Sequence, residues 1–135
     1  MVLRQPRGRS PALLLGLMLA LLLGRSVVAA TPAYLEPEVL NAALAMNLTD
    51  AQQARFQAVL ATLADGRQAR LERLRAEGAV DVASAMQAET TALMADMDAA
   101  VAEFLTETQQ APYRRYRDLL QHHMNQQEHS QGTQP

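Results

Sequence analysis

Three histidines near the C-terminal end are the residues whose types and spacing come closest to a metal site. His122, His123 and His129 are the only histidines of the 135-residue chain, and Asp118 stands four positions before His122. On a continuing helix Asp118, His122 and His129 share a face, and imidazole and carboxylate groups bind zinc, nickel or copper. The compact His-x-x-x-His pair is absent, so a solvated, slightly pH-sensitive helix is the other interpretation. Metal binding by these four residues is therefore kept as an alternative.

Residues that could catalyse a reaction are scarce. The chain has no cysteine, and after residue 30 its only serines are Ser84 and Ser130. Neither serine has an evident base beside it, and there is no Gly-x-Ser-x-Gly elbow or glycine-rich phosphate loop. Asp96 and Asp98 stand two positions apart, so on a helix their carboxylates point in different directions. We expect a protein that binds other molecules and is not an enzyme.

Arginines interrupt an apolar helix face in the middle of the chain. This face is formed by Phe56, Leu60, Leu63, Leu71 and Leu74. Arg67 falls within about 20° of its centre, and Arg70 lies on its flank. Because burying an unpaired charge is prohibitive, either Glu89 or a second copy of the chain pairs with them, or the face is partly open to water.

Two interpretations of this mixed face remain open. In the first, the arginines are paired, or reach solvent from a helix edge while their stems cover apolar surface. In the second, arginines and flexible methionines form a concave amphiphilic surface that contacts unfolded chains, because thioether side chains adapt to varied partners.

The pattern Leu-Thr-x-x-Gln occurs twice and marks two helix starts. Its residues are Leu48, Thr49, Gln52, Leu105, Thr106 and Gln109. A threonine followed three residues later by a glutamine forms a capping box, in which each side chain bonds to the other residue's backbone N–H. The two boxes predict one helix over residues 50–76, ended by Gly78, and another over residues 107–127.

Helix-forming residues dominate the intervening segments, and no stretch alternates as a strand does. A short helix is expected over residues 36–46, and a longer one over 81–104, whose apolar stripe comprises Val82, Met86, Leu93, Met97, Val101 and Phe104. The tight turn at residues 77–80 makes the two long helices an antiparallel hairpin. The expected fold class is all-α, with four helices.

The last helix has an apolar side and an irregular start. Tyr113, Tyr116, Leu120 and Met124 lie on one side. Pro112 stands six residues into this helix and lacks an N–H, so the first turn is expected to be distorted. The polar residues 128–135 are expected to form a disordered tail.

Residues 1–30 have the composition of a secretory signal peptide. Arginines precede the apolar run Ala12–Gly24, and small residues follow it up to Ala30, where cleavage is expected. The run has 13 residues, fewer than the roughly 20 that a membrane-spanning helix needs. Retention as an inner-membrane anchor is the alternative. Either outcome carries the rest of the chain across the membrane, because the N-terminal arginines stay on the cytoplasmic side.

The chain after residue 30 is acidic. It keeps eight of the 12 basic residues and all 14 acidic ones, a net charge of −6, which argues against nucleic acid as a partner. Without cysteine it has no disulfides, so packing must stabilise it. About 105 residues suffice for one helical domain, residues 31–127, yet leave apolar surface for a partner.

Two Leu-Thr-x-x-Gln boxes on a helical hairpin behind a signal peptide resemble the Spy/CpxP family of periplasmic proteins. The resemblance covers nearly all of residues 36–127. It implies an elongated, cradle-shaped antiparallel homodimer that binds unfolded or misfolded envelope proteins on its concave face without ATP. Some relatives instead restrain an envelope-stress sensor kinase, and more distant ones bind or sense heavy metals.

On this resemblance the surface that binds clients or a second copy comprises Leu63, Arg67, Arg70, Leu71, Met86, Leu93 and Met97. The well-known chaperones of the family have a markedly basic face that contains lysine, whereas this chain has no lysine. Its clients are therefore expected to differ or to bind more weakly. No cofactor is expected for a chaperone, and zinc, nickel or copper for the metal-binding alternative.

Overall fold

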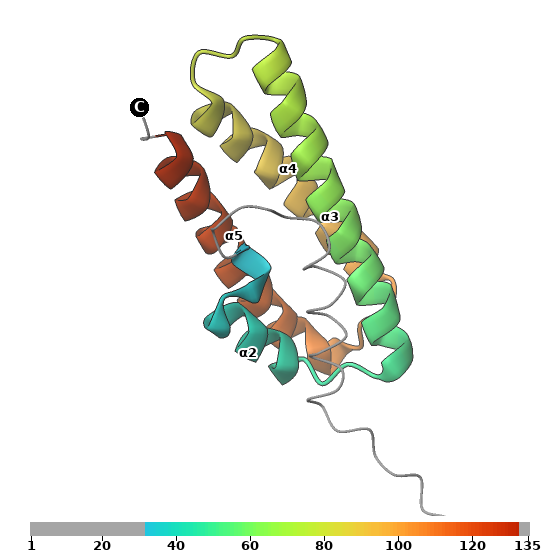
Figure 1. Ribbon diagram of the computed structural model, residues 1–135. Coiled ribbons are helices and arrows are strands. Elements are labelled where there is room, and N and C mark those ends of the chain that lie inside the picture. Colours follow the sequence, from blue (N-terminus) through green and yellow to red (C-terminus); the bar gives the residue numbers. More distant parts are fainter. Residues whose placement is uncertain (1–31, 133–135) are drawn as a thin grey trace, which may run out of the picture. The chain divides into compact units, whose positions relative to one another are not determined.

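The computed structural model describes residues 32–132, and all regular structure in this range is helical (Figure 1). In chain order the elements are η1 (Ala33–Leu35), α2 (Pro37–Ala45), α3 (Asp50–Ala76), α4 (Val82–Ala102), η2 (Glu107–Gln109) and α5 (Gln110–Gly132), where η marks a 3₁₀ helix. The predicted all-α class is confirmed. The predicted signal peptide, residues 1–30, lies outside the described residues. Among the helices of residues 32–132, none combines the length and the apolar composition that spanning a bilayer requires.

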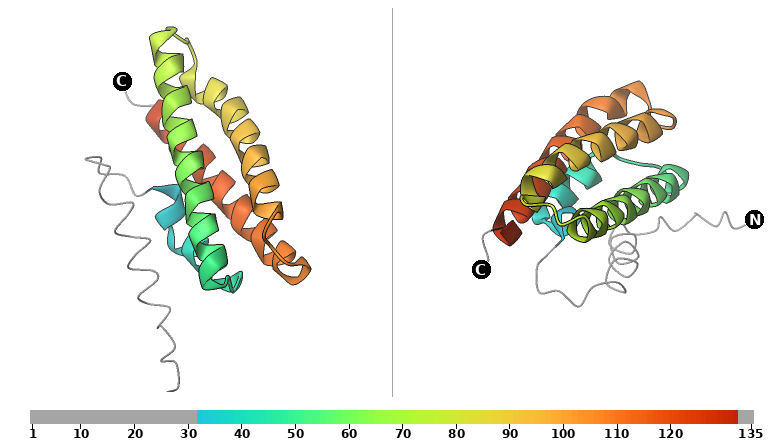
Figure 2. Two further views of the ribbon diagram at one scale, coloured as in Figure 1. Left: turned by 90° about the vertical axis from the view of Figure 1, so that its right-hand side faces the viewer. Right: turned by 90° about the horizontal axis from the view of Figure 1, so that it is seen from above.

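The long helices α3 and α4 form an antiparallel hairpin and lie side by side (Figures 1 and 2). Gly78 follows α3 with a φ of 69°, a conformation that glycine adopts without strain. Gly66 allows the two helices to approach closely, since a Cβ there would lie 2.9 Å from a methyl carbon of Leu93. Most of the two predicted apolar stripes is buried, at Phe56, Leu63, Leu74, Met86, Leu93, Met97 and Val101.

Helix α5 packs on α4 and on the short helix α2 (Figure 1). Its predicted apolar side is buried, at Tyr113, Tyr116, Leu120 and Met124. The rings of Tyr116 and Phe56 meet edge to face with centroids 5.2 Å apart, an arrangement that aromatic pairs favour. This pair joins α5 to α3 inside the core.

The distorted start predicted for the last helix is confirmed. Residues Glu107–Gln109 form a 3₁₀ turn, and the α-helix begins at Gln110. Pro112 therefore lies in the first turn of α5, where a backbone N–H has no acceptor within the helix and its absence costs little.

The disordered tail predicted from residue 128 is wrong for residues 128–132, because α5 continues to Gly132. Met124 and Glu128 stand one turn apart and are both buried. Polar composition suggested disorder, but an ion pair to Arg67 and a hydrogen bond from Thr90 hold Glu128 against α3 and α4. Residues 133–135 lie outside the described range.

Candidate functional site

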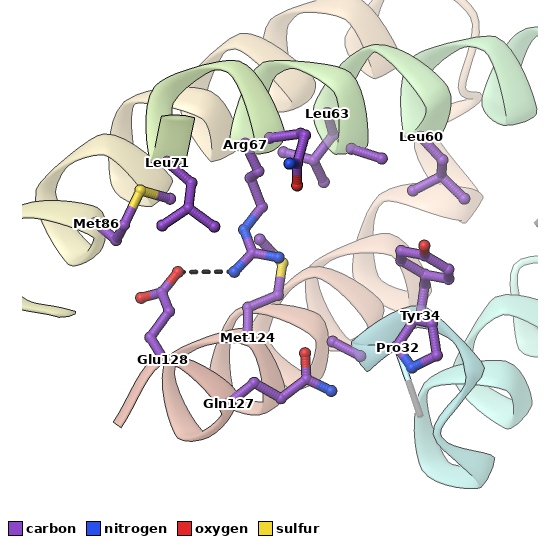
Figure 3. A pocket seen from close by; sticks show the side chains of 13 residues that line it. Pro32, Tyr34, Leu60, Leu63, Arg67, Leu71, Met86, Met124, Gln127 and Glu128 are labelled. Carbon is purple, nitrogen blue, oxygen red and sulfur yellow. Dashed lines mark hydrogen bonds and ion pairs between the residues drawn. The ribbon is translucent and has the colours of Figure 1, made fainter. Parts of the chain in front are cut away.

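A partly open cavity of about 220 Å³ lies between α3 and α5, with η1 at one side (Figure 3). We call it the α3–α5 groove. Its apolar lining comprises Pro32, Ala33, Leu60, Leu63, Ala64, Leu71, Met86 and Met124, and its polar lining comprises Tyr34, Arg67, Gln68, Gln127 and Glu128. Leu60, Leu71 and Tyr34 are only partly buried, so apolar surface faces the groove.

Arg67 extends from α3 across the groove toward α5 (Figure 3). Its Nη2 donates to Oε1 of Glu128 at 2.8 Å, and the same oxygen accepts the hydroxyl of Thr90 at 2.9 Å. Glu128 is 7% exposed and Thr90 is fully buried. One carboxylate on α5 therefore joins α3 and α4. Glu89 was one of the predicted partners of Arg67, and this part of the prediction is wrong.

The contact between Arg67 and Glu128 leaves two polar atoms unsatisfied. Nε of Arg67 and Oε2 of Glu128 are buried without a hydrogen-bond partner among residues 32–132. An unsatisfied buried polar group costs about 1–3 kcal/mol, so this contact stabilises the fold less than a complete bidentate pair would.

Glu89 instead pairs with Arg70, as the sequence allowed. Arg70 Nη1 donates to one carboxylate oxygen of Glu89, and Arg73 Nη2 lies 2.6 Å from the other. The hydrogen bond from Arg70 holds the pKa of Glu89 below its ordinary value. Both side chains of the Arg70 and Glu89 pair are partly exposed, so this pair stays in contact with water.

The predicted client surface divides between two cavities. Leu63, Arg67, Leu71 and Met86 line the α3–α5 groove. Leu93 and Met97 line a second cavity of about 230 Å³ between α3 and α4, which Leu63 also borders. Arg70 lines neither of these cavities. The role of these residues in client or partner binding stays a prediction.

Tyr34 is a groove residue that the sequence did not indicate, because it precedes the first predicted helix, residues 36–46, and follows no periodic pattern. Burial raises the pKa of its phenol, while the positive charge of Arg67 lowers it in part. The hydroxyl is therefore neutral at physiological pH and available as a hydrogen-bond donor. Glu128 was also missed, although it continues the spacing of Leu120 and Met124 by four residues.

The capping box predicted at the start of α3 is present. The N–H of Gln52 donates to Oγ1 of Thr49 at 3.2 Å, and the N–H of Thr49 donates to Oε1 of Gln52 at 2.9 Å. In the second box the N–H of Thr106 donates to Oε1 of Gln109 at 3.0 Å. The Thr106 hydroxyl also lies 3.2 Å from the hydroxyl of Thr108. Leu48 and Leu105 are partly buried beside the boxes.

The glutamines of the two boxes also bond to one another. Nε2 of Gln52 donates to Oε1 of Gln109 at 2.8 Å, and Nε2 of Gln109 donates to Oε1 of Gln52 at 3.0 Å. Each amide donates further to the chain just before the other box, Gln52 to the carbonyl of Phe104 and Gln109 to that of Asn47. The repeated pattern thus joins the segment before α5 to the start of α3.

The four candidate metal ligands do not gather. His123 lies 3.7 Å from a carboxylate oxygen of Glu38, and His122 contacts Gln126. His129 contacts Gln87, and Asp118 lies 3.5 Å from Arg117. Within residues 32–132 no group of three histidine or acidic side chains is placed to hold a metal ion. Metal binding by these residues is an untested alternative that no contact here favours.

No family model, no curated protein and no solved structure matches this chain. The groove, its arginine and the paired boxes are therefore interpreted from their own geometry.

Proposed function

We propose that this chain is an ATP-independent chaperone of the bacterial periplasm that holds segments of non-native proteins in the α3–α5 groove. The observation that carries the proposal is a guanidinium group, on Arg67, among partly exposed apolar side chains. Non-native chains expose apolar side chains beside charged ones, and a groove of this mixed character complements them.

The methionines add to this argument. Met86 and Met124 line the groove from two different helices. Their unbranched thioether side chains change rotamer at low cost, which suits a surface that receives many different sequences. The groove is partly open to solvent, so it can receive chain segments of different shapes.

The periplasmic location rests on the signal-like composition of residues 1–30, and the chaperone class on the two boxes of the Spy/CpxP resemblance. We propose further that two copies associate as an antiparallel, cradle-shaped dimer, which would extend the amphiphilic surface beyond one subunit. A sensor kinase of the envelope is a second partner that this class of protein would accept.

The test measures whether the exported protein suppresses aggregation of a chemically unfolded model enzyme, followed by light scattering without nucleotide. Replacing Leu60 and Leu71 by serine should weaken suppression severalfold, because both side chains line the groove and are partly exposed. Leu44→Ser is the matched control, since Leu44 is 49% exposed on α2 and lies outside the groove.

Two results would count against the proposal. The first is no suppression by the wild-type protein at severalfold molar excess over the client. The second is equal suppression by the Leu60→Ser/Leu71→Ser variant and the Leu44→Ser control, with both proteins folded by circular dichroism.

A further inference from the structure

The last two turns of α5 are polar, yet they present one apolar and one acidic side chain to the groove. Met124 and Glu128 stand four residues apart and therefore on one helix face, 2% and 7% exposed respectively. Met124 lines the groove beside Arg67, and Glu128 binds the guanidinium (Figure 3). The α3–α5 groove thus already holds a short segment that combines a carboxylate with an apolar side chain.

The part of this segment after Met124, Asn125–Gly132, is held weakly for a buried contact. The Glu128 carboxylate uses one oxygen for both of its hydrogen bonds, and its other oxygen is buried and unsatisfied. Gln126, His129 and Ser130 near it are exposed, and the bond between His129 and Gln87 lies at the surface, where water can replace it. Moving these turns into solvent therefore restores hydrogen bonds to water and exposes little apolar surface.

Arg67 has no such freedom, because it belongs to the middle of α3. If Glu128 leaves, the guanidinium remains beside Leu63, Leu71 and Met86 without a counter-charge. A charged group in apolar surroundings is stabilised most by an anion that bonds to it directly. A neutral group replaces only part of that interaction, and a cation opposes it.

We propose that the last turns of α5 are an internal ligand of the α3–α5 groove, and that the groove binds non-native segments in which a carboxylate side chain accompanies apolar ones. This inference rests on the proposed chaperone function and names the class of segment it takes. Glu128 occupies the position of the client's carboxylate, and a client binds by displacing it from Arg67. Arg67 is the residue that sets the preference.

The test uses the exported protein and three fluorescent peptides that share one apolar sequence and carry Glu, Gln or Lys at a single central position. Binding is followed by fluorescence anisotropy. The Glu peptide should bind about tenfold more tightly than the Gln peptide, the ratio expected of a hydrogen bond to a charged group, and the Lys peptide most weakly. Arg67→Gln should abolish the difference between the Glu and Gln peptides.

Variants of the internal ligand provide the second arm. Glu128→Gln should bind the Glu peptide severalfold more tightly than the wild type, because a weaker internal competitor is displaced. Thr90→Val should act in the same direction, since it removes one hydrogen bond to Glu128 and keeps the shape of the side chain. Glu77→Gln is the control, because it changes the charge by the same amount. Glu77 is exposed and lies outside the groove, so this variant should leave the affinity for the Glu peptide unchanged.

The results distinguish failure of the internal-ligand proposal from failure of the proposed chaperone function. Equal affinity for all three peptides overturns the acidic preference and leaves the chaperone proposal intact. Unchanged or weaker binding by Glu128→Gln and Thr90→Val, with both folded by circular dichroism, overturns the internal ligand. If no peptide binds and no client is protected, both proposals fall.

Discussion

Two polar contacts, one from η2 and one from α5, join the C-terminal part of the chain to α3, and they differ in almost every physical respect. The contact between Gln52 and Gln109 is neutral and reciprocal, and each amide also bonds to backbone groups. The contact between Arg67 and Glu128 is ionic, leaves a buried atom unsatisfied on each side and borders the groove. The contact between the glutamines, with its hydrogen bonding complete, is expected to persist in the folded protein. The contact between Arg67 and Glu128 is one that another molecule can replace.

The difference follows from what surrounds each pair. The glutamines lie where α2 ends, α3 begins and α4 ends, and these helix ends provide free backbone N–H and C=O groups. An amide has both donors and an acceptor, so it satisfies such groups on both sides. Arg67 and Glu128 lie among side chains of helix interiors, where few backbone groups are free to complete their hydrogen bonding.

The largest expected effect is that of Gln52→Ala. It removes half of a capping box, both hydrogen bonds between the two glutamine amides and the donor to the carbonyl of Phe104, so the free energy of unfolding should fall by about 3 kcal/mol. Urea unfolding followed by circular dichroism measures this change. Gln53→Ala is the matched control, because within residues 32–132 the hydrogen bond of the Gln53 amide is one long contact, 3.5 Å to the carbonyl of Leu48. Similar losses of unfolding free energy in both variants would show that the contact between Gln52 and Gln109 adds no particular stability.

Glu128→Ala should have a smaller and more local effect. The last turns of α5 can move into water, so the global free energy of unfolding should fall by only about 1 kcal/mol. Amide hydrogen exchange within residues 125–132 should become about tenfold faster, while exchange at the start of α3 stays unchanged. Gln126→Ala, at an exposed position of the same helix, is the control. A global loss as large as that of Gln52→Ala would remove the contrast between the two contacts.

The two boxes themselves should differ in strength. Thr49→Ala should cost about 1 kcal/mol of stability, because the hydroxyl accepts the N–H of Gln52 at the start of a regular α-helix. Thr106→Ala should cost only a few tenths of a kcal/mol, since its box begins with a 3₁₀ turn and its hydroxyl also contacts that of Thr108. Thermal unfolding of both variants ranks them, and the reverse order would contradict this reading.

A modest pH effect is expected from the partly exposed pair of Arg70 and Glu89. The hydrogen bond from Arg70 lowers the pKa of Glu89 in the folded protein, so its contribution is complete above the ordinary pKa of 4.5. The contribution is lost as the pH falls through the lowered value. Between about pH 6 and pH 3 the stability of Glu89→Gln should therefore decline less than that of the wild type. Parallel declines in urea titrations at each pH would show that this pair contributes nothing.

The smallest expected effect is that of metal ions. A zinc, nickel or copper ion bound at Asp118, His122, His123 or His129 would hold the end of α5 in place. It would thereby oppose the proposed displacement of these turns by a client. Because these side chains contact other residues and do not gather, titration calorimetry should show no saturable heat. A saturable heat that the His122/His123/His129 triple alanine variant loses would reverse this expectation.

Local signals in the sequence were sufficient to predict the helices, except for the end of α5 at Gly132. Pro37, Thr49 and Gly78 act on backbone groups within a few residues, so the bounds of α2 and α3 follow from neighbouring residues alone. Pro112 likewise predicted the irregular start of α5. The apolar stripes identified the core because burial follows helical periodicity.

The partners of the polar side chains could not be predicted in the same way. The sequence indicated that Gln52 and Gln109 cap helices, but their mutual hydrogen bonds depend on how the hairpin brings two distant segments together. Arg67 needed a counter-charge, and Glu89 was closer in sequence than Glu128, which polar composition assigned to a tail. Since Coulomb attraction favours any nearby carboxylate, only the packing of α5 decides between them.

The mutual hydrogen bonds of Gln52 and Gln109 have a geometric consequence for length variation. They close a loop of chain whose ends are 57 positions apart, so the outgoing helix α3 and the returning helix α4 must have matching lengths. One extra residue in only one of these helices would rotate all later side chains by about 100° and shift them by about 1.5 Å, which separates the two amides. Residues added at the exposed bend near Val80 leave the side chains of α3 and α4 in their positions. This bend is therefore where the chain can accept an insertion without breaking the hydrogen bonds between Gln52 and Gln109.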